Sequence, residues 1–515
     1  MHAIRSADGL DTPVTKSGIR LPVRRAGIDT YRQPVLFLHQ GCLVCRAEGF
    51  AALARVKVRC GNREIVTTLN VVTGDWLSDG EAALSDAAWN ALNPEPGAHA
   101  EFAHADPPES AGALRAKVFG ARLGEREFTS LLRDVLTARL SDIEVAAFVT
   151  ACAGERMDLD ESVALTRAMI AVGDRIDWGS GTVLDKHCVG GLPGNRTTPI
   201  VVSIVAALGH RIPKTSSRAI TSPAGTADVM ATMTRVDLDL DTLRRVVEKE
   251  GGCLASGGTM RLSPADDVLI QIERPLDFDS DGQMVASILS KKVAAGSTHV
   301  LIDIPVGPTA KVRTLAAADA IARRLAFVGD AMGLRVGIHM SDGTQPVGLG
   351  IGPALEAHDV LSVLRNSPDA PADLRTRALD VAGAVLDLAP GAESGQGRAQ
   401  AERVLHSGLA LQKFEAICAA QGGFREPGRA RYVTPYVAAT DGRIGRIDNR
   451  RLARVAKLAG APHDANAGIL CRLREGDRVH RGAPLFMVHA DSEGEMAYAL
   501  DYANAHPDIL TIQPE

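Results

Sequence analysis

The residues best suited to chemistry lie in a glycine-rich stretch at 185–199, with the sequence DKHCVGGLPGNRTTP. Its three glycines let backbone amides approach an oxyanion. Lys186 adds a positive charge, and Thr198 is placed to cap the next helix, with Pro199 in its first turn. The stretch predicts a phosphate site, although a plain glycine-rich turn has the same spacing. It holds neither a Walker motif nor G-x-G-x-x-G, so nothing in it indicates a nucleoside triphosphate or a dinucleotide.

A second stretch, at 214–228 (KTSSRAITSPAGTAD), is rich in hydroxyl groups and follows the next apolar run. The hydroxyls belong to Thr215, Ser216, Ser217, Thr221, Ser222 and Thr226. In an open α/β sheet, successive loops at the carboxyl ends of the strands lie together, and ligands bind there. We therefore expect the two stretches to form one phosphate cradle. An ordinary hydroxyl-rich surface loop is the alternative interpretation.

A third group of polar residues comprises Arg274, Asp279, Ser287, Lys291 and Lys292. Ser287 and Lys291 are four positions apart, so they share one face of a predicted helix. Taken alone, this group would be interpreted as a solvated helix face.

The elements that must position these residues change type along the chain. Strand-like alternation at 55–59 and 64–72, with a turn at Gly61-Asn62, indicates β-structure near the N-terminus. Apolar residues at three- and four-residue steps between Phe128 and Leu140 then indicate helices.

Farther along, short apolar runs at 182–184, 299–305 and 336–340 predict strands of a largely parallel sheet, with a helix at 200–208. The predicted fold class is multidomain α/β. Its parts are a small β-rich N-terminal domain at 1–100, a helical lobe at 113–178 joined in space by about 265–295, a large mostly parallel α/β phosphate-binding domain at 180–430, and a C-terminal α+β domain at 432–515.

Composition excludes several classes of function. Aromatic residues make up 4% of the 515-residue chain and the net charge is −5, so we expect no nucleic-acid partner. The longest apolar stretch, 200–209, is far short of the roughly 20 residues that span a bilayer, so no membrane partner is expected. The start lacks the apolar core of a signal peptide, which favours a cytoplasmic protein with reduced thiols.

The eight cysteines are scattered over the whole chain. Cys42 and Cys45, with Cys60 beyond, could be half of a zinc site or a redox pair. Because no second pair follows at finger spacing, ordinary thiols are the expected interpretation. We expect no metal site, since no His, Asp or Glu spacing indicates one.

Together, these stretches resemble a known family. The run DKHCVGG at 185–191 resembles the signature loop of the thymidine and pyrimidine-nucleoside phosphorylases, and ASILSKK at 286–292 resembles their base-binding helix. The likeness extends from about residue 114 to the C-terminus. GGLPGN at 190–195, KTSSRAITS at 214–222 and the additional N-terminal domain resemble the branch that includes archaeal AMP phosphorylases and bacterial proteins named as thymidine phosphorylases. Several long motifs in the same order are far more specific than one.

The resemblance implies roles for individual residues. Phosphate contacts are implied for Lys186, Thr198, Ser216 and Thr226, base contacts for Arg274, Ser287 and Lys291, and proton transfer for His187. In the AMP phosphorylases the proton donor is a carboxylic acid, which corresponds to Asp279. Their further nucleotide contacts correspond to Gly191, Ser217, Arg218, Ala219, Ile220, Thr221, Ser222, Thr226 and Lys311. Two departures affect the first loop: Cys188 replaces the serine usual in pyrimidine enzymes, and Pro193 is an insertion.

The implied activity is that of a pentosyltransferase without cofactors, in which inorganic phosphate is a substrate. Phosphate attacks the anomeric carbon while the base departs with growing negative charge. Hydrogen-bond donors must therefore surround the phosphate, and cations or an acid must lie beside the departing base. Arg274 and Lys291 could offset charge on a pyrimidine, and His187 or a protonated Asp279 could give a proton to a purine.

The expected reaction is phosphorolysis of thymidine, or of a related pyrimidine nucleoside, to the base and (deoxy)ribose 1-phosphate. Phosphorolysis of AMP to the base and ribose 1,5-bisphosphate is the alternative. A phosphoribosyltransferase that uses a diphosphate and magnesium and a non-catalytic nucleotide sensor are more remote. Small-molecule nucleosides or nucleotides and phosphate are the expected partners, and we expect a homodimer or larger homo-oligomer.

Overall fold

The computed structural model describes residues 20–219, 222–276, 280–393 and 395–514. By its internal contacts the chain divides into two compact units. The first ends at Arg115 and also includes Arg133–Val145, and the second comprises Ala116–Leu132 and the chain from Ala146 onward. Three helices contain the points of division: α3 (Ala111–Val118), α4 (Glu125–Leu136) and α5 (Asp142–Ala151).

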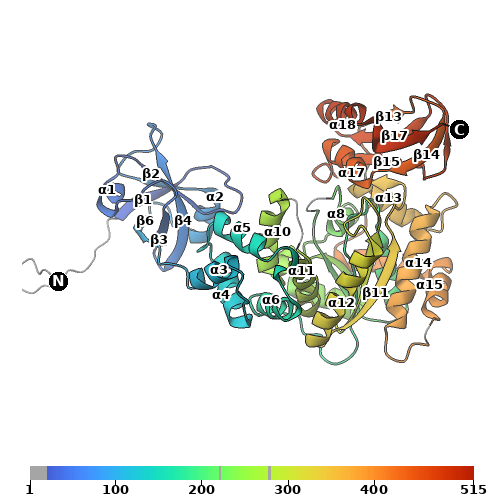
Figure 1. The fold of residues 1–515 in the computed structure, drawn as a ribbon, viewed down its shortest axis with the longest axis horizontal. Helices are drawn as coiled ribbons and strands as arrows, with labels where there is room; N and C mark the ends of the chain where they lie inside the picture. Colours follow the sequence, from blue (N-terminus) through green and yellow to red (C-terminus); the bar gives the residue numbers. More distant parts are fainter. Residues whose placement is uncertain (1–19, 220–221, 277–279, 394, 515) are drawn as a thin grey trace, which may run out of the picture. The chain divides into compact units, whose positions relative to one another are not determined.

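The first unit contains a closed six-stranded barrel, which is drawn in blue in Figure 1. Its strands, in the order β1-β5-β2-β4-β3-β6, are β1 (Arg20–Arg25), β5 (Ala82–Leu84), β2 (Val35–His39), β4 (Arg63–Val72), β3 (Arg55–Cys60) and β6 (His99–His104). Two short helices, α1 (Leu43–Glu48) and α2 (Asp86–Leu92), accompany them. The predicted alternation holds in β3, where Val56 and Val58 are fully buried between partly exposed neighbours.

Several helices of the second unit form a bundle. Helix α6 (Leu159–Ala171) packs along α11 (Asp281–Ala294), and α10 (Pro264–Leu276) precedes α11 in the chain. A buried ion pair between Lys117 and Glu161, 2.6 Å long, ties the end of α3 to α6.

A parallel sheet occupies the centre of the second unit. Its strands are β7 (Leu184–Cys188), β8 (Ile212–Ser216), β9 (Gly252–Ser256), β10 (His299–Val306) and β11 (Arg335–Asp342). They pair in parallel as β11-β10-β7 and β8-β9, and a bridge between Val183 and Arg211 joins β7 to β8. The carboxyl ends of β7, β8 and β9 therefore lie at one edge.

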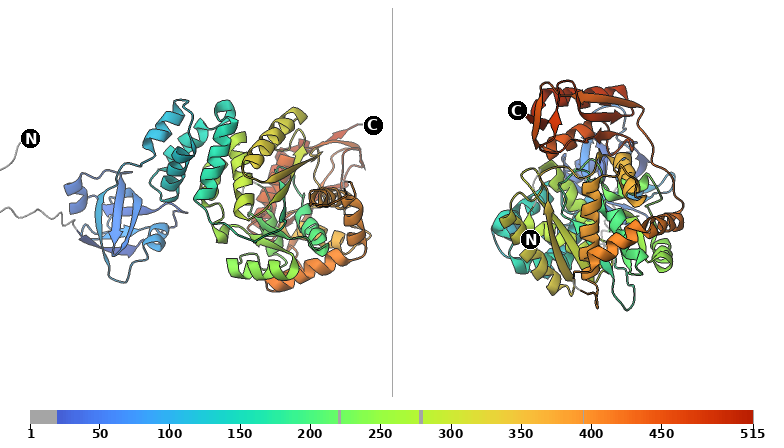
Figure 2. Two further views of the ribbon diagram at one scale, coloured as in Figure 1. Left: turned by 90° about the horizontal axis from the view of Figure 1, so that it is seen from below. Right: turned by 90° about the vertical axis from the view of Figure 1, so that its right-hand side faces the viewer.

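Helices cover both faces of this sheet, as two further views in Figure 2 also show. One face carries α11 and α12 (Leu315–Ala331), and the other carries α7 (Thr197–Ala207) and α14 (Ala372–Asp387). The remaining helices of this part are α8 (Thr226–Ala231), α9 (Leu240–Glu250), α13 (Pro353–Leu364), α15 (Gly397–His406) and α16 (Leu409–Gln421). Residues 197–206 of α7 are all buried, because helices and strands surround α7.

Two small sheets and two helices form the C-terminal part. The sheets are β12-β15-β17-β13 and β16-β14-β18. Their elements are β12 (Gly350–Ile351), β13 (Tyr432–Val437), β14 (Gly442–Ile447), β15 (Gly468–Leu470), β16 (Arg478–Val479), β17 (Pro484–Ala490) and β18 (Leu510–Gln513), with helices α17 (Asn449–Leu458) and α18 (Glu493–Ala505). Strand β12 lies before α13 in the chain and yet joins this sheet through β15.

The predicted fold class, multidomain α/β, is confirmed. In the described part of the chain, no helix combines the length and the apolar character needed to cross a membrane.

Candidate active site

Strand β7 carries the first predicted site residues. The prediction of a strand at 182–184 was wrong in its position, because Asp185, Lys186 and His187 lie inside β7 and not in the loop after it. Successive side chains of a strand point to opposite faces. Lys186 therefore faces α7, whereas Asp185 and His187 face α11.

Lys186 is 1% exposed, and its ammonium donates to the hydroxyls of Thr197 at 2.8 Å and Thr198 at 3.3 Å. Among the described residues, no carboxylate forms an ion pair with it. Burial lowers the pKa of Lys186, an effect that the neighbouring Cys188 and Asp303 oppose. Because the ammonium bonds to hydroxyls here, it remains available to a bound anion.

Thr198 does not cap α7, contrary to the prediction. The N-cap of α7 is Arg196, whose side chain makes no capping hydrogen bond, and Thr198 lies in the first turn. Since Thr197 and Thr198 accept hydrogen bonds from Lys186, their own hydroxyl hydrogens can point toward a ligand.

The glycine loop (residues 189–196) follows β7 and requires glycine for steric reasons. Gly190, Gly191 and Gly194 all have positive φ angles. A Cβ on Gly191 would lie 2.4 Å from the backbone nitrogen of Lys311, and one on Gly194 would lie 2.1 Å from the carbonyl oxygen of Val347. The loop is therefore packed tightly against two other segments. One of these segments, after β10, contains the predicted Lys311, which is partly buried.

Ser216, at the carboxyl end of β8, offers a second donor. Its Oγ is buried and has no hydrogen-bond partner within the described residues. A buried hydroxyl without a partner costs about 1–3 kcal/mol. An oxyanion bound at this edge of the sheet could remove that cost, and the phosphate role of Ser216 stays a prediction.

The hydroxyl loop (residues 217–225) follows Ser216. Asp228 closes it on itself, because Oδ2 accepts from the backbone amides of Ala219 at 2.6 Å and Gly225 at 2.9 Å. Arg218 is half exposed and pairs with Asp228 and Asp237. Ser217 and Ser222 are exposed. The predicted Ile220 and Thr221 lie outside the described residues.

Arg196 joins the two loops, and the sequence analysis missed it. Its guanidinium donates to the carbonyl of Ala224 at 2.9 Å and to Oγ1 of Thr226 at 2.7 Å. It also pairs with the buried Glu356 of α13 at 2.7 Å. The two loops therefore contact each other, as expected, and Arg196 makes the contact. In the sequence, its only distinguishing feature is that it is an arginine within a glycine-rich run.

The predicted base-binding residues lie on α10 and α11. Lys291 Nζ lies 2.5 Å from a carboxylate oxygen of Asp266 and 3.4 Å from Ser287 Oγ, to which it donates. The structure thus brings Ser287 and Lys291 together on one helix face. Arg274 belongs to α10, but its side chain is outside the described residues, as is Asp279.

Gln283 was not predicted, yet it lies on α11 two turns before Lys291 and one before Ser287. Its amide is buried, and neither the oxygen nor the nitrogen has a hydrogen-bond partner in the described part of the chain. An isolated glutamine on a helix gives no sequence signal for such a position.

Burial and four nearby lysines keep His187 unprotonated. Burial, followed by the charges of Lys292, Lys214, Lys291 and Lys186, holds the pKa of His187 well below its usual range. The imidazole is therefore neutral at pH 7. A neutral imidazole can accept a proton or donate its one N–H, but it does not carry a second proton to give to a leaving base.

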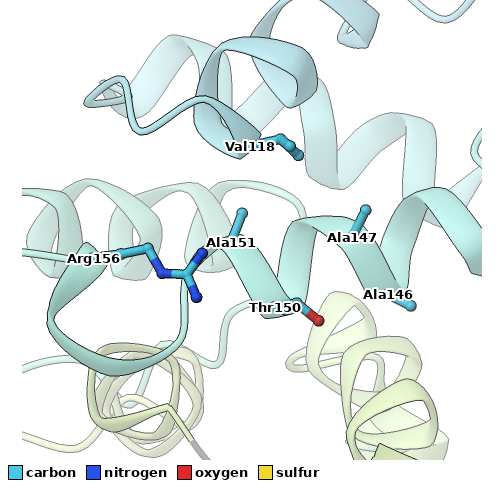
Figure 3. A pocket seen from close by; sticks show the side chains of 6 residues that line it. All are labelled: Val118, Ala146, Ala147, Thr150, Ala151 and Arg156. Carbon is cyan, nitrogen blue, oxygen red and sulfur yellow. The ribbon is translucent and has the colours of Figure 1, made fainter.

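Pockets elsewhere do not contain these residues. One is lined by Ala146, Ala147, Thr150 and Ala151 of α5 together with Val118 and Arg156, and Figure 3 shows Val118 directed toward α5. Another lies where β7 and β8 begin, around Thr182, His210 and Arg211. Among the described lining residues of both pockets there is no predicted site residue, so the candidate site remains at the carboxyl edge of the sheet.

The thiols of the barrel occupy its core. Cys42 and Cys45 are buried among apolar side chains, and burial raises the pKa of Cys45 to about 11. A protonated thiol is a poor metal ligand. In the residues that the structure describes, no three His, Cys, Asp or Glu side chains are grouped as a metal would require.

Comparison with family models divides the chain into three matched segments. The glycosyl transferase family helical bundle domain matches residues 111–173, and the a/b domain of the same family matches 180–411. The pyrimidine nucleoside phosphorylase C-terminal domain matches 443–509.

Full-length relatives are also similar to this chain. A Polaromonas sp. (strain JS666) protein named "Putative thymidine phosphorylase" is 58% identical over 493 residues, which cover 96% of each chain. "Putative thymidine phosphorylase 2" of Acidovorax sp. (strain JS42) is 56% identical, over 96% of this chain and 97% of its own. A Hahella chejuensis protein named "Putative thymidine phosphorylase" is 54% identical, over 96% and 98%.

Among solved structures, anthranilate phosphoribosyltransferase (TrpD) from Thermus thermophilus shares the fold. Its TM-score is 0.50 at 20% identity, over 60% of this chain and 99% of that chain. At this identity the likeness concerns the fold alone.

Gly194→Ala is expected to weaken the binding of inorganic phosphate roughly ten- to a hundredfold, because the new Cβ would collide with the Val347 carbonyl and displace the loop. Gly209→Ala is the matched control, since Gly209 also has a positive φ but no atom within 4 Å of the added Cβ. Calorimetric titration with phosphate measures both variants. Equal affinities in the two would contradict the steric argument.

The depressed pKa of His187 predicts an acid-dependent loss of stability. Below about pH 6.5 the unfolded chain binds a proton that the folded chain does not. The free energy of unfolding therefore decreases as the pH is lowered, by up to about 1.4 kcal/mol per pH unit. His187→Asn should flatten this slope between pH 7 and 5, whereas His406→Asn, at an exposed position, should not. Thermal midpoints across that range test it, and an unchanged slope in His187→Asn would show that the imidazole is not buried in its neutral form.

Proposed function

This chain belongs to the thymidine and pyrimidine-nucleoside phosphorylase family, and on that premise we propose that it cleaves a pyrimidine nucleoside, thymidine in the first place, with inorganic phosphate. The chain is a glycosyltransferase of the pentosyltransferase class. In the proposed reaction, a phosphate oxygen forms a bond to the anomeric carbon as the glycosidic bond breaks. The bonding electrons leave with the base, and the second product is a pentose 1-phosphate.

The observation that carries this proposal is the position of Lys186. Its buried ammonium lies beside two hydroxyls that it holds as acceptors, next to a loop whose glycines allow close approach. These donors are fixed before a ligand arrives. A preorganised set of donors stabilises charge more effectively than water does, because it need not reorient.

Donors on α11 support the choice of a pyrimidine. Ser287 and Lys291 supply a hydroxyl and an ammonium, which suit the carbonyl oxygens of a pyrimidine and the charge that develops as it departs. Asp266 holds Lys291 from α10. His187, neutral in this environment, would assist as a hydrogen-bond donor or a base.

AMP remains the second substrate to test. Its 5′-phosphate would need a cationic partner of its own, for which Lys311 and Arg218 are candidates. Arg218 is held by Asp228 at 3.4 Å and Asp237 at 2.7 Å, so a 5′-phosphate would have to displace these carboxylates. This disfavours AMP only modestly, because half-exposed ion pairs are weak. The cytoplasmic location, the absence of a cofactor and the homo-oligomer stay predictions.

A substrate panel tests the proposal. Thymidine, uridine, cytidine and AMP are incubated with and without inorganic phosphate, in the presence of EDTA, and release of the base is followed. Release from thymidine that requires phosphate and survives EDTA is expected. Cleavage of AMP without cleavage of thymidine would replace the proposal with the nucleotide reaction, and a requirement for magnesium and diphosphate would indicate a phosphoribosyltransferase.

Lys186→Ala should raise the KM for phosphate by about ten- to a hundredfold, because loss of a charge-assisted hydrogen bond costs roughly 1.5–3 kcal/mol. The KM for the nucleoside should change much less. Lys249→Ala is the control, since Lys249 is an exposed lysine of α9. Steady-state kinetics with each substrate varied in turn separates the two constants, and an unchanged phosphate KM in Lys186→Ala would remove Lys186 from the phosphate site.

A further inference from the structure

We propose that Arg196 and Glu356 form a clamp that holds the glycine loop and the hydroxyl loop in register, and that this clamp sets the affinity for phosphate. Both would be positioning residues, acting through the groups that they hold. The inference rests on the proposed function, since it assumes that the two loops bind phosphate.

Each of the three nitrogens of the Arg196 guanidinium contacts another group of the protein. Nε pairs with Glu356, Nη1 donates to Thr226 Oγ1 at 2.7 Å, and Nη2 donates to the Ala224 carbonyl at 2.9 Å. Only 12% of its side chain is exposed. A planar fork engaged at three nitrogens fixes geometry, and it leaves little capacity for a ligand. Arg196 therefore acts on the loops.

Thr226 shows how the clamp would affect phosphate. A threonine hydroxyl has one hydrogen to donate and two lone pairs. Because Oγ1 of Thr226 accepts from Arg196, its own hydrogen is turned away from Arg196 and can be donated to an oxyanion. Lys186 orients the hydroxyls of Thr197 and Thr198 in the same way. The two cations thus prepare hydroxyl donors at the starts of α7 and α8, directly after the two loops.

Glu356 anchors the arginine from α13. Its carboxylate is 1% exposed, with Oε2 on Arg196 and Oε1 accepting the backbone amide of Gly352 at 3.2 Å. Burial raises the pKa of Glu356, and Arg196 opposes this effect. Taking either partner alone away would leave an uncompensated group in the interior, which is strongly destabilising. The pair is therefore a rigid connection between α13 and both loops.

The described parts of the hydroxyl loop, residues 217–219 and 222–225, are held to one another, so a fixed point on one part also positions the other. Asp228 ties the amides of Ala219 and Gly225 together. A Cβ on Gly225 would lie 2.7 Å from the Ser217 carbonyl oxygen, which shows how closely the loop folds back. Arg196 holds this closed loop at Ala224 and Thr226, at the start of α8.

The test uses variants that avoid a buried unpaired charge. The double variant Arg196→Met with Glu356→Gln removes both charges at similar volume, a change that folded proteins often tolerate. Arg196→Lys keeps the charge but loses the fork, and should recover part of the function. Arg365→Ala with Glu426→Ala is the control, because that ion pair is exposed and involves the residue that ends α13.

Two readouts are measured on the full chain: the KM values for phosphate and nucleoside, and the rise in thermal midpoint on adding inorganic phosphate. We expect the double variant to raise the phosphate KM by about tenfold or more and to lose most of the phosphate-induced rise, with a small change in nucleoside KM. Arg196→Lys should lie between the double variant and the parent. The control pair should match the parent in both readouts.

A folded double variant with the parent's phosphate KM and thermal rise would overturn the clamp. So would equal losses for phosphate and nucleoside in Arg196→Lys, since they would indicate a general structural role. Failure of phosphate binding itself looks different, because the parent enzyme would then neither require inorganic phosphate for release of a base nor gain stability from it. In that case both proposals are wrong.

Discussion

Three buried lysines, Lys186, Lys214 and Lys292, lie on or beside strand β7, and the buried carboxylate of Asp185 lies between Lys214 and Lys292. Isolated buried ions cost several kcal/mol each, so the arrangement depends on how Asp185 is shared. Its carboxylate accepts from Lys292 at 2.8 Å and lies 3.8 Å from Lys214. Burial would raise the pKa of Asp185, but these two cations keep it below its usual value.

This sharing explains the properties of the groups on either side of β7. Lys214, the more distant partner of Asp185, has a pKa well below its usual range because of burial and the nearby Lys292. Burial, together with the positive charge of the same lysines, keeps His187 neutral. Lys186 points to the opposite face, where, within the described residues, its ammonium donates to two hydroxyls and pairs with no carboxylate, so its charge is available to a ligand. Strand β7 therefore separates the cluster of Asp185 and its two lysines from Lys186, whose charge can act on a ligand.

The sequence predicted what depends on local pattern and missed what depends on distant partners. Alternation and helical spacing were sufficient for the barrel strand β3 and for the helices, and the glycine and hydroxyl stretches marked both loops. Strand β7 was predicted too early in the chain, because three polar residues in a row indicate a loop. They can lie in a buried strand here because Lys292, from another element, pairs with one of them. Arg196 was missed for the same reason: Glu356 lies 160 positions away.

The C-terminal part also supports the glycine loop at the carboxyl edge of the parallel sheet, through residues 347–351. The amide of Val347 donates to the Pro193 carbonyl in the glycine loop, and Gly194 packs against the Val347 carbonyl. Three positions later, β12 pairs with β15. Arg474 donates to the Gly348 carbonyl and pairs with Asp373 at 2.9 Å. The segment that supports the glycine loop is therefore itself held by C-terminal residues, so the loop's geometry depends on a sheet that contains none of the predicted site residues.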